Sequence, residues 1–263
     1  MNSFFWTLAA AAFILSSVTF AGFWFFGRKI NNYSIVDIVW SYSFLFIVCF
    51  FVAFSDGWIL RKILLLGMVG AWSLRLGTFL FWRIYKSHPA EDNRYQNLRK
   101  KYAPKVATNF FWFFQFQAWS VVLLCFMFLE ISLNPLPEVS TLEKFGFCIW
   151  LLAFVGEALA DHQMTSFRTD PKNKGQTCKV GLWRYSRHPN YFFESLIWWG
   201  FFIFALGTAG TFYTIYSPLI ILLLLLKVTG IPPAEAQSLK SRGEAYRQYQ
   251  RETSAFIPWF PKI

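Results

Sequence analysis

The chain is built around seven apolar stretches, and these constrain its fold more than any other feature of the sequence. They cover residues 4–26, 33–54, 63–82, 110–131, 145–160, 191–206 and 212–228. A hydrocarbon core about 30 Å thick requires roughly 20 apolar residues per helix, and a lipid-exposed backbone must satisfy its own hydrogen bonds. The stretches lack the alternating pattern of membrane β-strands. We therefore predict an all-α integral membrane bundle of about seven transmembrane helices.

The composition agrees with a membrane protein. Hydrophobic residues make up 56% of the chain and charged residues only 15%, whereas about 25% of the residues of a typical soluble domain are charged. A length of 263 residues leaves room for six to eight spans and little else. We expect one domain over residues 1–263.

The distribution of basic residues predicts the orientation of this bundle. In a seven-span arrangement, 21 of the 25 lysines and arginines fall on one side and three on the other, while Arg75 lies within a span. Because lysine and arginine are retained in cytoplasmic loops, the N-terminus is expected outside and the C-terminal tail in the cytoplasm. The net charge of +11 then indicates loops that face anionic membrane lipid. We expect no nucleic-acid partner, because the basic residues form no continuous stripe.

Four charged side chains fall within the predicted spans: Asp37, Arg75, Glu157 and Glu194. Each costs at least about 2.5–3.5 kcal/mol on insertion scales, so such residues face the protein interior and tend to mark function. Alternatively, Asp37 or Glu157 pairs with Arg75 only to hold helices together. Asp161 lies one turn after Glu157 on the same helical face, where a carboxylate can reach a ligand or form an ion pair with Arg168.

The densest polar motif is the segment 181–194, which leads into the sixth apolar stretch. Its polar and aromatic side chains include Arg187, His188, Asn190, Tyr191 and Glu194. Arginines beside a helix N-terminus are typical of a phosphate site. Asn190 and Glu194 lie four residues apart on one face and could bind an amide or ribose hydroxyls. A positive-inside signal with interfacial aromatics would explain the arginines, but it would not explain Asn190 and Glu194 entering the membrane together.

The C-terminal tail, residues 235–262, places Tyr246 among basic residues that include Arg242. The spacing suits an amphipathic helix on the cytoplasmic surface. Lipid binding alone would account for much of this pattern. A lid that adds basic groups to a phosphate pocket is the sharper hypothesis.

Two motifs together resemble the steroid 5-alpha-reductase superfamily, in particular its bacterial, uncharacterised branch of 3-oxo-5-alpha-steroid 4-dehydrogenase-like membrane proteins. They are the Gly-Leu-Trp-Arg-Tyr-Ser-Arg-His-Pro-Asn-Tyr-x-x-Glu run at 181–194 and Ser-Ala-Phe-Ile-Pro-Trp at 254–259. Segments 34–40, 72–77 and 161–168 support the similarity. The resemblance implies a seven-helix bundle in the bacterial inner membrane, with a cofactor site that faces the cytoplasm. Residues 1–109 would form the substrate side and residues 110–263 the cofactor side.

The resemblance also implies an NADPH-dependent reductase. The reaction would transfer a hydride to a C=C bond conjugated to a ketone in a lipophilic, steroid- or isoprenoid-like substrate, and protonation would follow. Steroid-reducing members hold the substrate carbonyl with a glutamate and a tyrosine, and the corresponding catalytic positions here are Asp37 and Trp72. The NADPH-binding residues implied by the matching motifs are Arg75, Asp161, Arg168, Asn190 and Glu194. Their position in the same turn adds Arg187, His188 and Tyr191, and the pattern of the tail adds Arg242 and Tyr246.

Two other classes of protein fit part of the pattern. Membrane methyltransferases of the isoprenylcysteine carboxyl methyltransferase type carry an Arg-His-Pro-x-Tyr turn and a basic tail, but they bind S-adenosylmethionine. A small transporter or lipid-binding scaffold would also use buried charges, although neither an inverted repeat nor a broken span is evident. No metal site is expected, because the three histidines lack the spacing of zinc ligands. Nothing in the sequence indicates an obligate protein partner.

Overall fold

A computed structural model of the protein describes residues 3–262. Within that range every regular element is a helix, and β-pairing is limited to one isolated bridge between Ser186 and Ser254. The prediction of an all-α protein is confirmed. The chain divides into two compact units, Met1–Glu138 and Val139–Ile263. The two units therefore meet near residue 138. The resemblance instead places the boundary between the substrate side and the cofactor side at residues 109 and 110.

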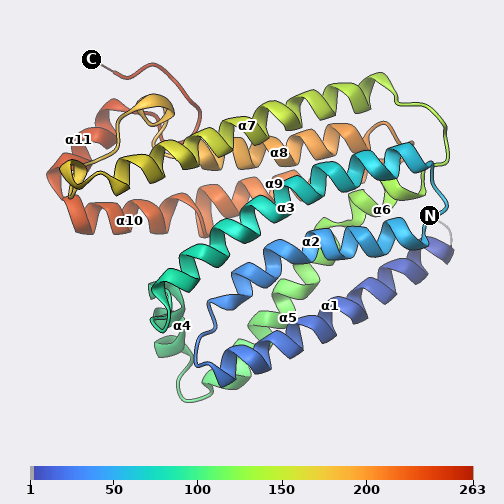
Figure 1. Ribbon diagram of the computed structural model, residues 1–263, viewed down its shortest axis with the longest axis horizontal. Coiled ribbons are helices and arrows are strands. Elements are labelled where there is room, and N and C mark those ends of the chain that lie inside the picture. Colours follow the sequence, from blue (N-terminus) through green and yellow to red (C-terminus); the bar gives the residue numbers. More distant parts are fainter. Residues whose placement is uncertain (1–2, 263) are drawn as a thin grey trace. The chain divides into compact units, whose positions relative to one another are not determined.

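Unit 1 contains six helices: α1 (Ser3–Lys29), α2 (Ile35–Phe54), α3 (Ile59–Ser87), α4 (Asn93–Tyr102), α5 (Val106–Leu124) and α6 (Phe126–Leu133). Helix α2 packs mainly on α3, and α1 packs on α5 (Figure 1). The predicted stretch 110–131 is divided between α5 and α6, which meet at Cys125. Arg61 is buried and donates hydrogen bonds of 3.0 and 2.8 Å to the carbonyls of Asn134 and Leu136. These bonds fix the segment that follows α6.

Unit 2 consists of helices and short helical turns: α7 (Thr141–Thr169), η1 (Pro171–Asn173), η2 (Gly181–Arg184), α8 (Pro189–Ala205), η3 (Thr211–Ile215), α9 (Tyr216–Leu223), η4 (Leu224–Val228), α10 (Ile231–Arg242) and α11 (Glu244–Glu252). A capping box of Ser140 and Glu143 begins α7. Pro189 occupies the first position of α8, where its missing N–H costs nothing. Gly243, with φ of 54°, makes the turn between α10 and α11.

Helices α7 and α8 pack backbone against backbone. A Cβ atom built on Gly146 would lie 2.3 Å from the backbone nitrogen of Phe204, and one on Gly200 would lie 2.8 Å from the Cα of Trp150. Both separations are shorter than any tolerated contact. Small residues at such crossings are typical of helix pairs in membranes, where close packing replaces the hydrophobic effect as the driving force.

We expect Gly146→Ala and Gly200→Ala each to destabilise the protein by about 1–3 kcal/mol, because the added methyl group would force the two helices apart. Thermal unfolding in detergent measures the effect. Gly67→Ala is the matched control, since a Cβ on Gly67 of α3 would meet nothing within 4 Å. If Gly146→Ala and Gly200→Ala both unfold at the wild-type temperature, this account of the packing is contradicted.

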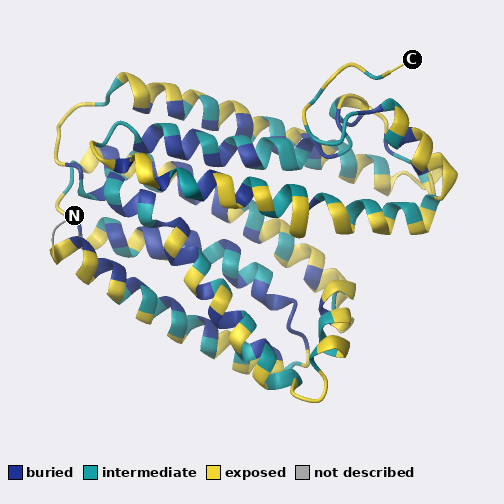
Figure 2. Ribbon diagram, turned by 180° about the vertical axis from the view of Figure 1, so that it is seen from behind, coloured by how far each residue is buried: buried dark blue, intermediate teal, exposed yellow. Residues whose placement is uncertain are grey.

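Several helices are long and apolar enough to cross a membrane. By length and composition these are Ser3–Lys29, Ile35–Phe54, Ile59–Ser87, Val106–Leu133 and Thr211–Arg242. They carry exposed apolar side chains, such as Ile14 and Phe25 of α1. Figure 2 shows exposed positions along the ribbon of α1. The remaining two predicted spans lie within α7 and α8, and α8 has only 17 residues. The protein is therefore a multi-pass membrane protein with five candidate spans among its described residues.

Candidate functional site

In unit 2 a half-buried ion pair connects the turn before α8 to α10. The Nε of Arg187 donates to Oε1 of Glu235 over 2.7 Å, and the two side chains are only 10% and 17% exposed. Nη1 of Arg187 also donates to the carbonyls of Gln250 and Thr253, at 2.9 and 2.6 Å. Arg187 is therefore held by several acceptors that belong to the C-terminal tail.

The tail is folded onto the segment 178–188. The buried hydroxyl of Tyr249 donates to the carbonyl of Trp183, and Oγ of Ser186 donates to the carbonyl of Phe256 over 2.8 Å. The backbone N–H of Trp259 donates to the carbonyl of Tyr185 over 2.9 Å. Figure 1 shows α11 and the C-terminal segment next to this loop, at one end of α7. The tail thus packs against the segment that leads into the candidate site.

Several predicted cofactor-binding residues lie next to these contacts of the tail. His188 lies 3.4 Å from Glu235 through its Nε2 atom, and its ring stacks on that of Tyr191 with 5.3 Å between centroids. Tyr246 is buried, and both burial and the nearby carboxylate of Glu235 raise its pKa. Its hydroxyl therefore stays protonated at neutral pH.

Two cations of the site lie close to one another. Desolvation, followed by the charge of the neighbouring Arg242 guanidinium, lowers the pKa of Arg168 in the last turn of α7. Tyr191 also lies close enough to interact with Arg168. Two arginines that repel each other beside an aromatic ring form a suitable site for a phosphate group, because a bound anion would relieve the repulsion.

Asn190 supplies an unsatisfied polar atom in the first turn of α8. Its Oδ1 is buried and accepts no hydrogen bond from any described residue. A buried acceptor without a donor costs about 1–3 kcal/mol, so such an atom calls for an explanation. One turn later on the same face, Oε1 of Glu194 accepts a hydrogen bond of 3.0 Å from Nε1 of Trp198. A ligand that donates N–H or O–H groups would satisfy Asn190.

The remaining predicted cofactor residues occupy two different units. Asp161 is half-buried on α7, one turn after the buried Glu157. Arg75 is half-buried within α3 of unit 1. Their assignment to a cofactor stays a prediction.

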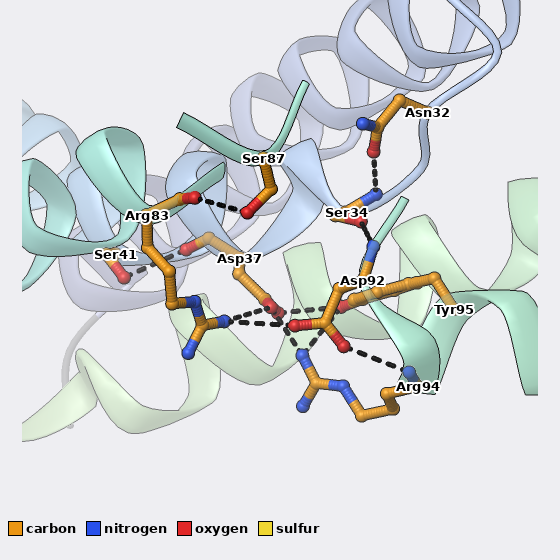
Figure 3. A network of polar contacts seen from close by, with 9 residues as sticks. All are labelled: Asn32, Ser34, Asp37, Ser41, Arg83, Ser87, Asp92, Arg94 and Tyr95. Atoms are coloured by element: carbon orange, nitrogen blue, oxygen red, sulfur yellow. Dashed lines mark hydrogen bonds and ion pairs between the residues drawn. The ribbon is translucent and has the colours of Figure 1, made fainter. Parts of the chain in front are cut away.

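The two predicted catalytic residues, Asp37 and Trp72, lie in unit 1. Trp72 is 0% exposed and meets the ring of Phe44 edge-on, with 5.1 Å between centroids. Asp37, in the first turn of α2, accepts a hydrogen bond of 2.7 Å from the hydroxyl of Tyr95 and another from the guanidinium of Arg94 (Figure 3). Burial and the Asp37 carboxylate raise the pKa of Tyr95, so its hydroxyl remains a donor.

The pairing of Asp37 corrects one alternative from the sequence. Its ion pairs are with Arg94 and, at 4.0 Å, with Arg83, so the interpretation that Asp37 pairs with Arg75 is wrong. Helix α4 explains the difference. Asp92 caps its first turn by accepting from the backbone N–H of Arg94, and the helix then delivers Arg94 and Tyr95 to Asp37.

Sequence reasoning missed Glu235 as the residue that joins Arg187, His188 and Gln250. It is the single acidic residue between positions 195 and 243. An isolated carboxylate at the start of a basic tail was the available signal. Its partner Arg187 is 48 residues away in the chain, and helical spacing carries no information over that distance.

Comparisons with known proteins place the chain in a family. Comparison with curated proteins and with solved structures gives no match. The family model described as "Protein of unknown function (DUF1295)" matches residues 23–253, which include every predicted cofactor-binding and catalytic residue. Because the match covers most of both units, the chain belongs to the DUF1295 family.

Proposed function

We propose that the protein is a membrane-embedded, NADPH-dependent reductase of a C=C bond conjugated to a ketone in a lipophilic, steroid- or isoprenoid-like substrate. One observation carries the proposal: the buried Oδ1 of Asn190 lacks a hydrogen-bond donor in the unit that also holds the interacting cations Arg168 and Arg242. The resemblance of segments 181–194 and 254–259 to the steroid 5-alpha-reductase superfamily supports it. We further propose that α7 and α8 complete a seven-span bundle with an outside N-terminus.

The residues of unit 2 fit NADPH by their chemistry. Guanidinium groups bind phosphates through paired N–H donors, and Arg168 and Arg242 supply them. The nicotinamide amide and the ribose hydroxyls donate hydrogen bonds that Asn190 and Glu194 can accept. When bound, NADPH supplies the hydride.

The other polar residues would shape this site. Tyr191, held by stacking on His188, presents an aromatic ring to a nucleotide, and Tyr246 and Asp161 add polar groups. Arg187 and His188 act mainly by fixing the tail through Glu235, because their contacts already run to it. In the proposed topology the site faces the cytoplasm, where NADPH is available, and Arg75 is added to it by the resemblance alone.

The substrate side of the proposal rests on Asp37 and Trp72. The indole N–H of Trp72 can donate a hydrogen bond to a carbonyl oxygen, but it is a poor proton source. Trp72 is 0% exposed and Asp37 is engaged by Arg94 and Tyr95. A substrate would reach either residue only after the neighbouring side chains move.

Binding of NADPH, NADH and S-adenosylmethionine to detergent-purified protein tests the proposal. We expect micromolar affinity for NADPH, weakened about tenfold or more by Asn190→Ala, since a hydrogen bond to a buried group is worth about 1–2 kcal/mol. Glu194→Ala should have a similar effect, and Arg184→Gln is the control because this exposed arginine of the same loop lies outside the cluster. Preferential binding of S-adenosylmethionine would support the methyltransferase instead, and binding of none of the three would support a scaffold or transporter.

A further inference from the structure

A polar pocket lies in unit 1, where the last turns of α3 meet the start of α4. Its volume is about 350 Å³. The polar residues that line it are Ser34, Arg83, Ser87, Glu91, Asp92, Asn93 and Gln96. Neither the predicted cofactor-binding residues nor Asp37 and Trp72 line this pocket, so the proposed reductase chemistry leaves it unexplained.

Arg83 and Asp92 face each other in this pocket without a tight bond (Figure 3). Nη2 of Arg83 is 3.5 Å from Oδ2 of Asp92 and 4.0 Å from Oδ2 of Asp37, and the Arg83 side chain is 46% exposed. Its guanidinium makes no hydrogen bond to any residue between 3 and 262. A loose, partly exposed pair of this kind contributes little to stability, and both partners remain accessible to a ligand.

The ion-paired side chains around the pocket balance in charge, which limits the ligands that the pocket would accept. Three carboxylates and three guanidiniums form the cluster: Asp37, Glu91, Asp92, Arg83, Arg94 and Arg99. Arg94 binds Asp37, and Arg99 binds Glu91 at 3.0 Å, so Arg83 and Asp92 are the loosest pair. A neutral cluster does not attract an anion over long range. It is complementary to a ligand that carries one positive and one negative group.

The aromatic side chains beside the pocket indicate its depth in the membrane. Trp82 and Tyr85, which flank Arg83 on α3, are 52% and 64% exposed, and Phe81 is 42% exposed. Exposed aromatic rings gather at the level of the lipid head groups. Because Arg83 lies on the same turns of α3, the pocket opens at head-group depth with an apolar surface next to it for acyl chains.

We propose that this pocket binds the phosphoethanolamine head group of a membrane phospholipid, with the phosphate on Arg83 and the ammonium on Asp92. A guanidinium binds phosphate oxygens through paired N–H donors, and a primary ammonium offers three N–H donors to a carboxylate. The trimethylammonium of a choline lipid has no such donors, and a glycerol head group has no positive charge. The pocket therefore distinguishes head groups that share the same acyl chains.

Native mass spectrometry of the full-length protein with palmitoyl-oleoyl lipids tests the proposal. We expect the ethanolamine lipid to bind about tenfold more tightly than the choline and glycerol lipids, as one added charge-assisted hydrogen bond predicts. Asp92→Asn should abolish this preference while keeping the cap of α4, since asparagine is also a good N-cap residue. Arg83→Gln should weaken binding of all three lipids. Lys86→Gln is the matched control, because it removes the same charge three residues along α3 from a residue outside the pocket.

Two results would overturn the proposed head-group recognition, and a third would show that the ligand is not a lipid. Equal binding of ethanolamine and choline lipids by the wild-type protein would exclude recognition of the ammonium. Tighter binding of the glycerol lipid would show that the surface selects anionic lipid. Soluble O-phosphoethanolamine should compete only at far higher concentration than the lipid, and competition at equal concentration would assign the pocket to a free metabolite.

Discussion

Replacing Arg187 with methionine is expected to destabilise unit 2 by about 1–3 kcal/mol, because the half-buried carboxylate of Glu235 loses its closest charged partner. Glu235→Gln should cost a comparable amount, since it leaves the Arg187 guanidinium without its counter-charge. The loss should appear as a lower unfolding temperature and as faster proteolysis of the C-terminal tail, because Arg187 also donates to the carbonyls of Gln250 and Thr253. Both readouts work without added ligand.

The double variant separates this structural role from a direct role in cofactor binding. If the two side chains stabilise the fold mainly through each other, Arg187→Met with Glu235→Gln should cost clearly less than the sum of the single variants. Arg184→Met, at an exposed position of the same loop, should stay within about 0.5 kcal/mol of wild type. A stable Arg187→Met variant that has lost NADPH binding would instead make Arg187 a ligand contact.

Replacing both Arg168 and Arg242 with glutamine should lower the affinity for NADPH by more than about 100-fold, since each charge-assisted hydrogen bond to a phosphate is worth about 1.5–3 kcal/mol. Each single variant should lose about tenfold or more. Calorimetry or thermal shift with NADPH measures the loss. If the pair holds the 2′-phosphate, the affinity for NADH should fall much less.

Although these substitutions should lower the affinity for NADPH, they should leave the stability of the ligand-free protein unchanged or raise it. The pKa of Arg168 is lowered by desolvation and by Arg242, so the ligand-free protein carries unfavourable repulsion that either substitution relieves. Arg168→Gln should therefore unfold at the wild-type temperature or above it, as expected where binding groups are kept at a cost to stability. Lys172→Gln, an exposed substitution just after α7, is the control for both readouts. A fall in stability with unchanged NADPH affinity would remove this pair from the proposed site.

The sequence predicts where the helices are better than where they end. Each of the seven apolar stretches falls mainly on helical residues, because the bilayer requirement leaves few alternatives. The ends differ for local reasons. Helix α3 continues past residue 82 to Ser87 through the polar residues Arg83 and Lys86, which hydropathy excludes from a span. Helix α4 lies within a polar segment and depends on its cap, Asp92, rather than on an apolar face.

The candidate site could be predicted as a set of residues but not as a set of bonds. Local spacing placed Asn190 and Glu194 on one face of a helix, and the structure agrees. The same reasoning treated Arg187 as an available cation, because its counter-ion Glu235 is far away in the chain. It likewise offered Arg75 as a partner for Asp37, whereas α4 supplies Arg94. A local pattern reveals which groups are present, and only the fold reveals which of them are already engaged.

The contacts between the segment 178–188 and the tail have a consequence for the order in which the protein matures. The carbonyls of Trp183 and Tyr185 are bound by Tyr249 and Trp259, and the apolar helices α8 and α9 lie between these partners in the chain. Tyr249 and Trp259 therefore leave the ribosome only after α8 and α9 have been made. The contacts of the segment 178–188 with the tail form late, and a newly made chain passes through a stage in which these apolar helices exist while the candidate site is still open.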